Sequence, residues 1–283
     1  MSDRLKIVRT VETLRGQVSQ WRRRDMRTAL VPTMGALHDG HLRLVEMGLR
    51  TADRVVVTIF INPQQFAPGE DLDAYPRTEK TDVEKLRTAG AHLVYAPPLL
   101  EMYPEGFCTS VSAAGPAKAG LEDKSRPHFF DGVTTVVAKL FIAAGCDYAM
   151  FGEKDFQQLK VVTKMTRDLS IPTSVIGVPT VRADDGLALS SRNAYLSEEQ
   201  RKIAPFLYQT LQGLATDIRD GKNMTRACSI AAKNLAKTGF KTDYVEVRVA
   251  ETLEPVKSLS ETELRILAAA WLGNTRLIDN IAV

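Results

Sequence analysis

Two histidines lie three positions apart in the most distinctive short stretch of this sequence. The stretch runs from residue 32 to residue 41 and reads PTMGALHDGH, with His38 and His41 inside it. It follows a short apolar run and precedes a helical pattern, so a helix that begins near His38 would place both rings on one face. Two imidazoles there can donate hydrogen bonds to phosphate oxygens that gain charge in a transition state. On spacing alone such a pair is more often structural or metal-binding, whereas the strand–loop–helix context favours phosphate.

The backbone of the same loop is suited to close ligand approach. In an α/β sheet, ligands bind at the carboxyl ends of strands. The free N–H groups at a helix start favour phosphate. Gly35 and Gly40 carry no Cβ that would keep a ligand away. We therefore expect phosphate to contact the backbone of this loop.

Two further clusters carry positive charge. An apolar strand is expected to end at Phe151, and the next three residues are Gly152, Glu153 and Lys154. Lys154 offers a point charge for phosphate. The alternative is a solvated lysine beside a turn. The run Ser190-Ser191-Arg192 combines two hydroxyls with a guanidinium, which can bind the β and γ phosphates and stabilise departing pyrophosphate. Its alternative is a polar linker between domains.

Two glutamines could bind a ligand through uncharged side chains. Gln65 and Gln158 each carry an amide that can both donate and accept hydrogen bonds. Such groups suit a hydroxy acid, which presents a carboxylate and hydroxyls. A surface glutamine is the ordinary alternative at either position.

Strand-like and helix-like segments alternate over the first two-thirds of the chain. Strands are expected at 28–32, 54–61, 91–96, 148–151 and 174–178, and helices at 41–51, 78–89 and 134–144. This alternation predicts right-handed crossovers and a parallel sheet covered on both faces. The sequence therefore predicts an α/β fold with a Rossmann-like doubly wound parallel sheet.

The pattern changes near Arg182. Ser197 and Gln200 form a capping-box pattern that predicts the start of a long helix, and a second helix is expected at 224–238. Strands are expected at 242–250, 264–271 and 276–280, with a hairpin turn at Gly273-Asn274. We therefore predict two domains, a catalytic one at 1–182 and a smaller α+β lid at 183–283.

The composition excludes several classes of protein. Of the 283 residues 44% are hydrophobic and 25% charged, and a net charge of +3 is too weak to favour nucleic-acid or membrane partners. Three cysteines without a CxxC pattern are typical of reduced thiols in a cytosol. The N-terminus has no apolar region of the signal-peptide type, and no apolar run approaches the ~20 residues of a membrane span. We therefore expect a cytoplasmic protein.

Five longer blocks resemble the pantothenate synthetase family, in that family's order and separations. The HxGH-type run at 38–41 also resembles the HIGH-like signature of the nucleotidyltransferase superfamily, whose members make adenylates. The resemblance covers essentially the whole chain. The five blocks are 31–42, 59–66 (IFINPQQF), 71–77 (DLDAYPR), 151–158 (FGEKDFQQ) and 185–193 (DGLALSSRN).

This resemblance implies an AMP-forming ligase of pantothenate biosynthesis, the route to coenzyme A. Such an enzyme joins pantoate to β-alanine through a pantoyl-adenylate and releases pyrophosphate and AMP. Its small-molecule partners would be pantoate, β-alanine and ATP, with Mg²⁺ bound mainly through the ATP phosphates. The family also implies a homodimer.

The resemblance assigns roles to individual positions and no side chain to a metal. The catalytic residues would be His38, His41, Lys154, Ser190, Ser191 and Arg192. ATP would be bound by Met34, Gly35, Ala36, Leu37, His38, Asp39, Gly40 and His41, by Gly152, Glu153, Lys154 and Asp155, and by Val181, Leu189, Ser190, Ser191 and Arg192. Pantoate and β-alanine would be bound by Gln65 and Gln158.

One stretch departs from the family pattern. Many members read RPxHFxGV, whereas residues 126–133 read RPHFFDGV, so that Phe129 occupies the histidine slot and His128 precedes it. Any role of the family's histidine is therefore not carried over, and we expect His128 to be structural or exposed.

Two other functions remain to be weighed. A related transferase with a nucleotide monophosphate as acceptor would call for cationic groups where Gln65 and Gln158 stand. An idle nucleotide-binding or RNA-binding module would lack the charges of Lys154 and Arg192, or show a basic stripe. The sequence has neither feature.

Overall fold

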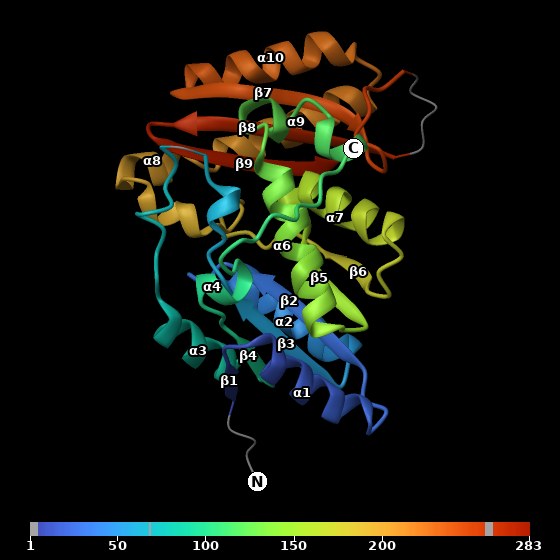
Figure 1. Ribbon diagram of the computed structural model, residues 1–283. Coiled ribbons are helices and arrows are strands. Elements are labelled where there is room, and N and C mark those ends of the chain that lie inside the picture. Colours follow the sequence, from blue (N-terminus) through green and yellow to red (C-terminus); the bar gives the residue numbers. More distant parts are fainter. Residues whose placement is uncertain (1–4, 68, 258–262) are drawn as a thin grey trace. The chain divides into compact units, whose positions relative to one another are not determined.

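The computed structural model describes residues 5–67, 69–257 and 263–283. Contacts divide the chain into two compact units (Figure 1). The first comprises Met1–Glu153 and Gln158–Pro179, and the second comprises Lys154–Gln157 and Thr180–Val283. The short segment Lys154–Gln157 thus groups with the second unit, although it lies within the N-terminal part of the chain.

The first unit is built on a six-stranded parallel sheet with the order β1-β4-β3-β2-β5-β6. From β4 to β6 this is the strand order of a Rossmann fold, with its topological switch point between β2 and β5. The predicted doubly wound parallel sheet is confirmed. Its strands are β1 (Lys6–Val8), β2 (Thr28–Thr33), β3 (Arg54–Ile59), β4 (Leu93–Tyr95), β5 (Tyr148–Gly152) and β6 (Ser174–Val178).

The central strands are apolar on both sides because helices cover both faces of the sheet. Ala29 and Val57 point toward the core shared with α2 and α3, while their neighbours Leu30 and Val56 point to the opposite face and are equally buried. In Figure 1, α1 and α6 pack together on that opposite face. The helices are α1 (Val11–Arg22), α2 (Asp39–Thr51), α3 (Glu79–Thr88), α4 (Leu99–Met102), α5 (Glu122–Ser125), α6 (Phe129–Ala144) and α7 (Phe156–Asp168), with 3₁₀ turns η1 (Pro63–Gln65), η2 (Gly115–Lys118) and η3 (Glu153–Asp155).

Several helices of this unit differ from the expectation, and the one-turn helices α4 and α5 have no predicted counterpart. Helix α6 begins at Phe129, five residues before the predicted start at 134. Helix α7 was not predicted, although Leu159, Val162 and Met165 repeat at helical spacing and are buried. The FGEKDFQQ block overlaps the first turn of this helix, since residues 156–158 belong to both.

The second unit is a three-stranded antiparallel sheet that packs against helices α9 and α10. The sheet has the order β7-β8-β9, and the hairpin turn predicted at Gly273 is confirmed, with a φ of +59°. Its elements are η4 (Ser191–Tyr195), α8 (Glu198–Ile203), α9 (Phe206–Arg219), α10 (Met224–Lys237), β7 (Phe240–Val249), β8 (Leu264–Leu272) and β9 (Thr275–Ala282).

The long helix predicted from Ser197 is wrong in its length. The capping box itself is confirmed, because Ser197 Oγ accepts from the Gln200 N–H at 3.3 Å and Gln200 Oε1 accepts from the Ser197 N–H at 3.0 Å. The helix ends at Ile203, however, and α9 begins only at Phe206. Pro205 lies between them, and its ring removes a backbone donor that a continuous helix requires.

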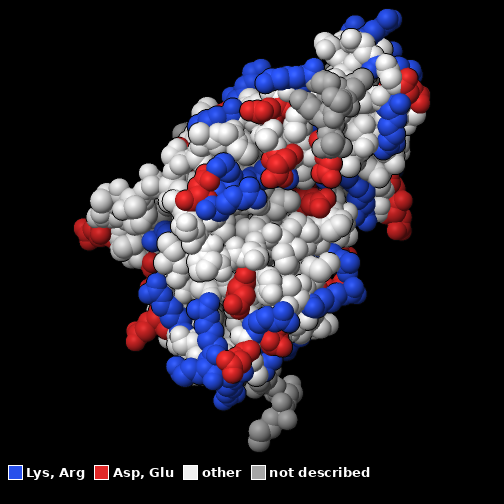
Figure 2. Space-filling model, turned by 90° about the vertical axis from the view of Figure 1, so that its right-hand side faces the viewer, with Lys and Arg blue, Asp and Glu red and all other residues white. Residues whose placement is uncertain are grey.

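On the face shown in Figure 2, acidic and basic residues are interspersed around a broad uncharged area. None of the helices in the described ranges combines the length and apolarity needed to cross a membrane. Cys108, Cys146 and Cys228 are all free thiols.

Candidate active site

The loop after β2 brings the two predicted histidines into contact. His38 is the N-cap residue of α2, and His41 is the third residue of that helix. The Gly40 N–H donates to His38 Nδ1 at 3.1 Å, while the His38 N–H donates to His41 Nδ1 at 3.3 Å. The two rings have centroids 4.1 Å apart. The expectation that both rings share one face of the helix start is confirmed.

These capping bonds decide which ring nitrogen carries the proton. A backbone N–H can only donate, so Nδ1 of His38 and Nδ1 of His41 both act as acceptors. In a neutral imidazole the proton then resides on Nε2. Each ring therefore presents an Nε2–H donor, the group that can hydrogen-bond a phosphoryl oxygen.

A buried carboxyl group holds the loop that leads to this pair. Asp82 on α3 is fully buried, with 0% exposure. One of its oxygens accepts from the Ala36 N–H at 2.9 Å and from the Thr78 hydroxyl at 3.0 Å, and the other accepts from the Leu37 N–H at 2.9 Å. The Lys85 ammonium donates to the Leu37 carbonyl at 2.6 Å. The loop is thus fixed by side chains of α3 before any ligand binds.

Asp82 also corrects the expectation about backbone donors. We expected the N–H groups of this loop to be available to phosphate. Those of Ala36 and Leu37 donate to Asp82, and that of Gly40 donates to His38. Each is engaged because a buried backbone donor without a partner is costly. These three backbone donors are therefore engaged within the protein.

The conformation of the loop explains its glycine. Gly35 has a φ of +84°, and a Cβ at this position would lie 3.2 Å from Asp82 Oδ2. Ala36 also adopts a positive φ, +51°, which is uncommon for a residue with a side chain. Leu37 is buried in the core, Met34 is partly buried and Asp39 is exposed at the first turn of α2. The loop is therefore a fixed structure anchored through Leu37.

Gln65 lies at the end of η1, after β3, and is nearly buried at 9% exposure. Its Oε1 accepts from Asn62 Nδ2 at 3.1 Å, and its carbonyl accepts from Arg126 Nη2 at 2.7 Å. Arg126 in turn pairs with Glu70 through Nε and Nη2, at 2.7 and 2.8 Å. Gln65 is therefore held at both its backbone and its side chain.

The departure from the family pattern has a structural consequence at this point. Phe129, in the family's histidine slot, lies under Arg126 with the guanidinium carbon 3.9 Å from the ring centroid. His128 is exposed at the N-cap of α6 and makes no side-chain capping bond. In this chain Phe129 thus packs against the guanidinium of Arg126, which donates a hydrogen bond to the Gln65 carbonyl.

The remaining predicted residues of the first unit lie after β5. Gly152 is the last residue of that strand, and Glu153 opens η3. Gln158 is partly buried on α7. Strands β2 and β5 are neighbours in the sheet, so their carboxyl ends flank the switch point, where ligands bind in such folds.

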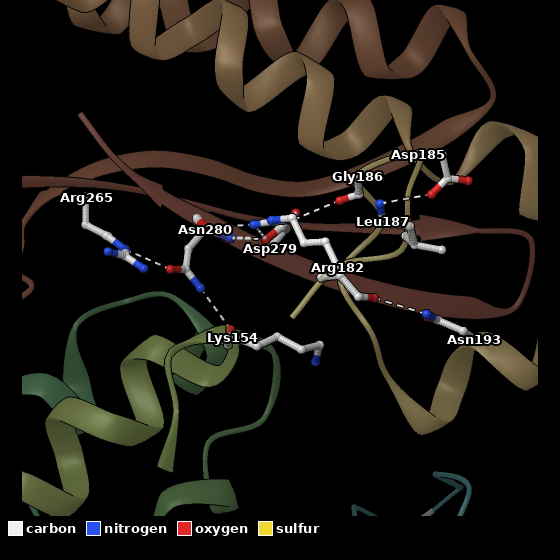
Figure 3. Close-up of polar contacts among 10 residues, drawn as sticks. Lys154, Arg182, Asp185, Gly186, Leu187, Asn193, Arg265, Asp279 and Asn280 are labelled. Carbon is white, nitrogen blue, oxygen red and sulfur yellow. Dashed lines mark hydrogen bonds and ion pairs between the residues drawn. The ribbon is translucent and has the colours of Figure 1, made fainter. Parts of the chain in front are cut away.

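Lys154 belongs to the second unit, where β9 holds its backbone. Its carbonyl accepts from Asn280 Nδ2 at 2.9 Å, and Asn280 Oδ1 accepts from Arg265 Nε at 2.7 Å (Figure 3). The Lys154 side chain is 19% exposed, and its ammonium lies 3.8 Å from the carboxylate of Asp155. The position of Lys154 is thus set by a strand more than a hundred residues further along the chain.

A buried ion pair holds the segment that leads to the predicted serines. The Arg182 guanidinium donates two hydrogen bonds to the Asp279 carboxylate, from Nη1 to Oδ2 at 2.6 Å and from Nη2 to Oδ1 at 2.8 Å (Figure 3). Its guanidinium lies 3.7 Å from the centroid of the Tyr208 ring. Val181 and Leu189 join across a short antiparallel bridge, in which the Leu189 N–H donates to the Val181 carbonyl at 3.0 Å. The ion pair therefore anchors the base of a turn that ends at the serines.

Ser190, Ser191 and Arg192 lie together at the start of η4. Ser190 is the N-cap residue, and its Oγ accepts from the Arg192 N–H at 3.3 Å. Ser191 and Arg192 are both partly buried. The Ser190 hydroxyl oxygen accepts this one capping bond, so its hydrogen can still be donated to a phosphate oxygen of a ligand.

Sequence reasoning missed several residues that position the site. Asp82, Tyr103 and the pair Arg182–Asp279 contact residues 41 to 97 positions away in the chain. No local spacing predicts such contacts. Asn62 could have been found, because it lies in the same NPQQF run as Gln65.

Comparison with known sequences gives one consistent result. Residues 6–282 match the family model described as pantoate-beta-alanine ligase. Pantothenate synthetase of Rhodopseudomonas palustris is 54% identical over 277 residues, which cover 98% of each chain. That of Paramagnetospirillum magneticum is 54% identical over 284 residues, covering 100% of this chain and 99% of the relative.

Solved structures agree with the sequence matches. Pantothenate synthetase of Thermus thermophilus superposes with a TM-score of 0.92 at 45% identity, covering 98% of this chain and 99% of that one. Pantoate-beta-alanine ligase of Francisella tularensis, complexed with beta-gamma ATP and β-alanine, gives a TM-score of 0.80 at 31% identity, with coverage of 98% and 97%. With its Rossmann-like sheet and its HIGH-type histidine pair, this chain belongs to the pantoate–β-alanine ligase family.

Proposed function

We propose that this chain condenses pantoate with β-alanine at the expense of ATP, through a pantoyl-adenylate. The observation that carries the proposal is the capped pair His38 and His41. Both rings are fixed as Nε2–H donors beside the switch point of a Rossmann-like sheet. This arrangement suits a reaction in which negative charge develops on phosphate oxygens.

The reaction has two halves and needs no nucleophile from the protein. In the first, a pantoate carboxylate oxygen attacks the α-phosphorus of ATP, and the bond to the β-phosphate oxygen breaks as pyrophosphate leaves with the electron pair. In the second, the β-alanine amine attacks the activated carbonyl, AMP leaves, and the amine loses a proton. The protein's contribution is positioning and charge stabilisation.

Each predicted catalytic residue has a role in this scheme. His38 and His41 donate hydrogen bonds to the phosphate around the reacting phosphorus. Lys154 supplies a point charge, while Ser190, Ser191 and Arg192 bind the phosphates that leave as pyrophosphate. ATP enters as its Mg²⁺ complex, and the ion is held mainly by phosphate oxygens, because Mg²⁺ usually keeps several waters. The other predicted ATP-binding residues lie in the segments 34–41, 152–155 and 181–192, and in this proposal they surround ATP.

Gln65 and Gln158 hold pantoate in this proposal. Gln65 is supported by its near burial and by the contacts that fix it to Asn62 and Arg126. A neutral amide in a nearly buried site matches the oxygen atoms of a hydroxy acid without the cost of an unpaired buried charge.

We propose further that residues 183–283 act as a lid on ATP. The proposed catalytic groups are divided between the two units, with Lys154 and the Ser190–Arg192 run in the second. A lid would exclude water, to which an acyl-adenylate is sensitive. Hydrogen exchange tests this idea: amides of η4 should be protected when an ATP analogue and pantoate are both bound. Unchanged exchange in η4 would contradict the lid.

The family resemblance also leads us to propose a homodimer. Light scattering at the concentrations used for activity assays should give twice the chain mass of 31.2 kDa. A mass of one chain under those conditions would contradict this assignment.

The decisive experiment separates the two half-reactions. Replacing His41 or Lys154 with Ala should lower the rate of pyrophosphate release from ATP and pantoate by about 10²–10³-fold, the typical cost of one lost donor. The same variants should convert supplied pantoyl-adenylate and β-alanine with a much smaller loss, since AMP is already a good leaving group. Single-turnover assays measure each half.

Two outcomes would count against these roles. Equal losses in both halves would mean that the residues only hold the shared adenylate. Pyrophosphate release that does not depend on pantoate would contradict the assigned substrate. Nicotinate mononucleotide and a reaction without acceptor serve as controls, because a related transferase would respond to the former.

A further inference from the structure

We infer that Asn62 and Tyr103 orient the Gln65 amide so that its NH₂ group, and not its oxygen, faces the ligand. The inference deepens the proposed function and rests on it, because it takes pantoate as the ligand of Gln65. It assigns positioning roles to Asn62 and Tyr103, which lie outside the predicted set of site residues.

The orientation of Asn62 is fixed by two backbone groups. Its Nδ2 lies 3.1 Å from the Gly132 carbonyl, which can only accept. Its Oδ1 lies 3.3 Å from the Gln64 N–H, which can only donate. Exchanging the nitrogen and oxygen of Asn62 would oppose like groups at both contacts. Asn62 is 1% exposed, so water cannot relieve such a mismatch.

The orientation of Asn62 determines that of Gln65. Asn62 Nδ2 is a donor, so the Gln65 atom 3.1 Å away from it must be the acceptor Oε1. The Gln65 NH₂ group therefore points away from Asn62. Within the described residues, no hydrogen bond to this NH₂ group is found. A nearly buried donor of this kind gains most from an acceptor supplied by a ligand.

Tyr103 completes the chain of hydrogen bonds from its far end. Its hydroxyl donates to Asn62 Oδ1 at 2.8 Å. Burial raises the pKa of Tyr103 to about 12, so the hydroxyl keeps its proton at neutral pH and remains a donor. The ring packs against Phe60 and Phe107, at centroid distances of 6.1 and 5.1 Å. Every member of the series Tyr103–Asn62–Gln65 thus has a defined direction of donation.

Close packing keeps this arrangement in place. A Cβ added to Gly132 would lie 2.2 Å from the Gln64 carbonyl oxygen, so α6 approaches η1 as closely as a backbone can. Arg126 also donates to the Gln65 carbonyl, at 2.7 Å. Neither η1 nor the Gln65 amide can turn without breaking a contact.

The consequence for recognition is a preference for acceptors. Pantoate offers carboxylate and hydroxyl oxygens, and the Gln65 NH₂ group can donate to either. A charged acceptor gives the stronger hydrogen bond. The carboxylate that must attack phosphorus is therefore the group best matched to Gln65, provided that pantoate binds there.

Substitutions at Gln65 test the direction of donation. Gln65→Ala should weaken pantoate binding by about 5- to 150-fold whichever way the amide points. Gln65→Glu keeps the shape and an oxygen toward Asn62 but removes both donors. We expect Gln65→Glu to be at least as damaging as Gln65→Ala, whereas a side chain that accepts from a pantoate hydroxyl would tolerate this change. Pantoate KM is the measure, and an unchanged KM for ATP is the control for folding.

A double-mutant cycle tests the positioning roles. Asn62→Ala should raise the pantoate KM in the native background and should add little in the Gln65→Ala background, because Asn62 acts through Gln65. Tyr103→Phe should cause only a few-fold loss, since Oδ1 keeps the Gln64 N–H. Additive effects of Asn62→Ala and Gln65→Ala would overturn the positioning role.

The outcomes separate this inference from the proposed function. If Gln65→Ala leaves the pantoate KM unchanged, the assignment of Gln65 to pantoate is wrong and the inference falls with it. If Gln65→Ala is impaired but Gln65→Glu binds pantoate normally, pantoate binding at Gln65 stands and the direction of donation is wrong.

Discussion

Each unit of this molecule contains a buried aspartate that positions a proposed catalytic segment, and the two do so by different means. Asp82 in the first unit accepts from two backbone N–H groups and one hydroxyl, and thereby fixes the loop before His38. Asp279 in the second unit pairs with the guanidinium of Arg182, and thereby fixes the segment before Ser190.

The difference reflects what each carboxylate must hold. A loop whose own N–H groups are buried needs an acceptor, and Asp82 satisfies two such groups at once. The segment around Arg182 is joined to β9 through a side chain, and a planar guanidinium matches both oxygens of Asp279. The first arrangement depends on acceptors and the second on charge, so substitutions should affect them differently.

The largest effect is expected from Arg182→Ala. It leaves Asp279, whose side chain is 3% exposed, as a buried charge without its partner. Loss of one partner of a buried pair costs about 3–5 kcal/mol. The chain has two tryptophans, with Trp21 in the first unit and Trp271 in the second. Urea unfolding in a Trp21→Phe background, followed by Trp271 fluorescence, measures the free energy of unfolding of the second unit.

The double variant Arg182→Met with Asp279→Leu is the matched control. Removing both charges should cost far less than removing one. A double variant as unstable as Arg182→Ala would mean that packing against Tyr208, and not charge, makes the contact important.

A smaller effect on stability, with a clear effect on catalysis, is expected from Asp82→Asn. The amide keeps one acceptor, so either Ala36 or Leu37 faces an NH₂ group instead of an oxygen. The unpaired donor should cost about 1–3 kcal/mol in the first unit, measured through Trp21 in a Trp271→Phe background. Because the loop carries His38, pyrophosphate release should also slow by about 10-fold or more. Normal adenylation in a folded Asp82→Asn variant would show that the loop does not need this anchor.

Thr78→Val tests the third donor of the same carboxylate. It removes the hydroxyl that lies 3.0 Å from Asp82 and keeps the shape of the side chain. One net hydrogen bond is worth about 0.5–1.5 kcal/mol, so the loss of stability should be smaller than in Asp82→Asn. Adenylation should be nearly unchanged, since both backbone bonds remain. A loss as large as that of Asp82→Asn would place the hydroxyl on a par with the backbone donors.

The smallest effect is expected at the exposed pair Arg201 and Asp185. Their side chains are 39% and 43% exposed, and the hydrogen bond from Arg201 lowers the pKa of Asp185 below its ordinary 3.8. A lowered folded-state pKa means that the stabilisation is present above pH 3.8 and is lost as the pH falls through the folded value. Arg201→Ala should therefore cost less than about 1 kcal/mol at pH 7.

Acid and salt should remove even this small difference. Wild type and Arg201→Ala should unfold alike at low pH and at high ionic strength. A persistent difference at pH 2 would show that the Arg201 side chain contributes by packing rather than by charge.

Local pattern was sufficient for much of this molecule. Five of the six strands of the Rossmann-like sheet follow from apolar runs, because strands buried on both faces consist mostly of apolar residues. The short edge strand β1 was not predicted, and only one of its three residues is buried. The capping box at Ser197, the turn at Gly273 and the shared face of His38 and His41 likewise depend on residues within four positions of one another. The break before α9 is also a local feature of the sequence, because Pro205 cannot continue a helix.

Tertiary structure alone decided what holds the site. Asp82 meets the Leu37 N–H across 45 positions, Tyr103 meets Asn62 across 41, and Arg182 meets Asp279 across 97. Whether a loop N–H is open to phosphate or already donated to Asp82 cannot be predicted from the loop itself. The reason is physical: helical and strand periodicity encode which face of an element is buried, whereas the partner of a buried polar group is whichever complementary group the fold brings within 3 Å.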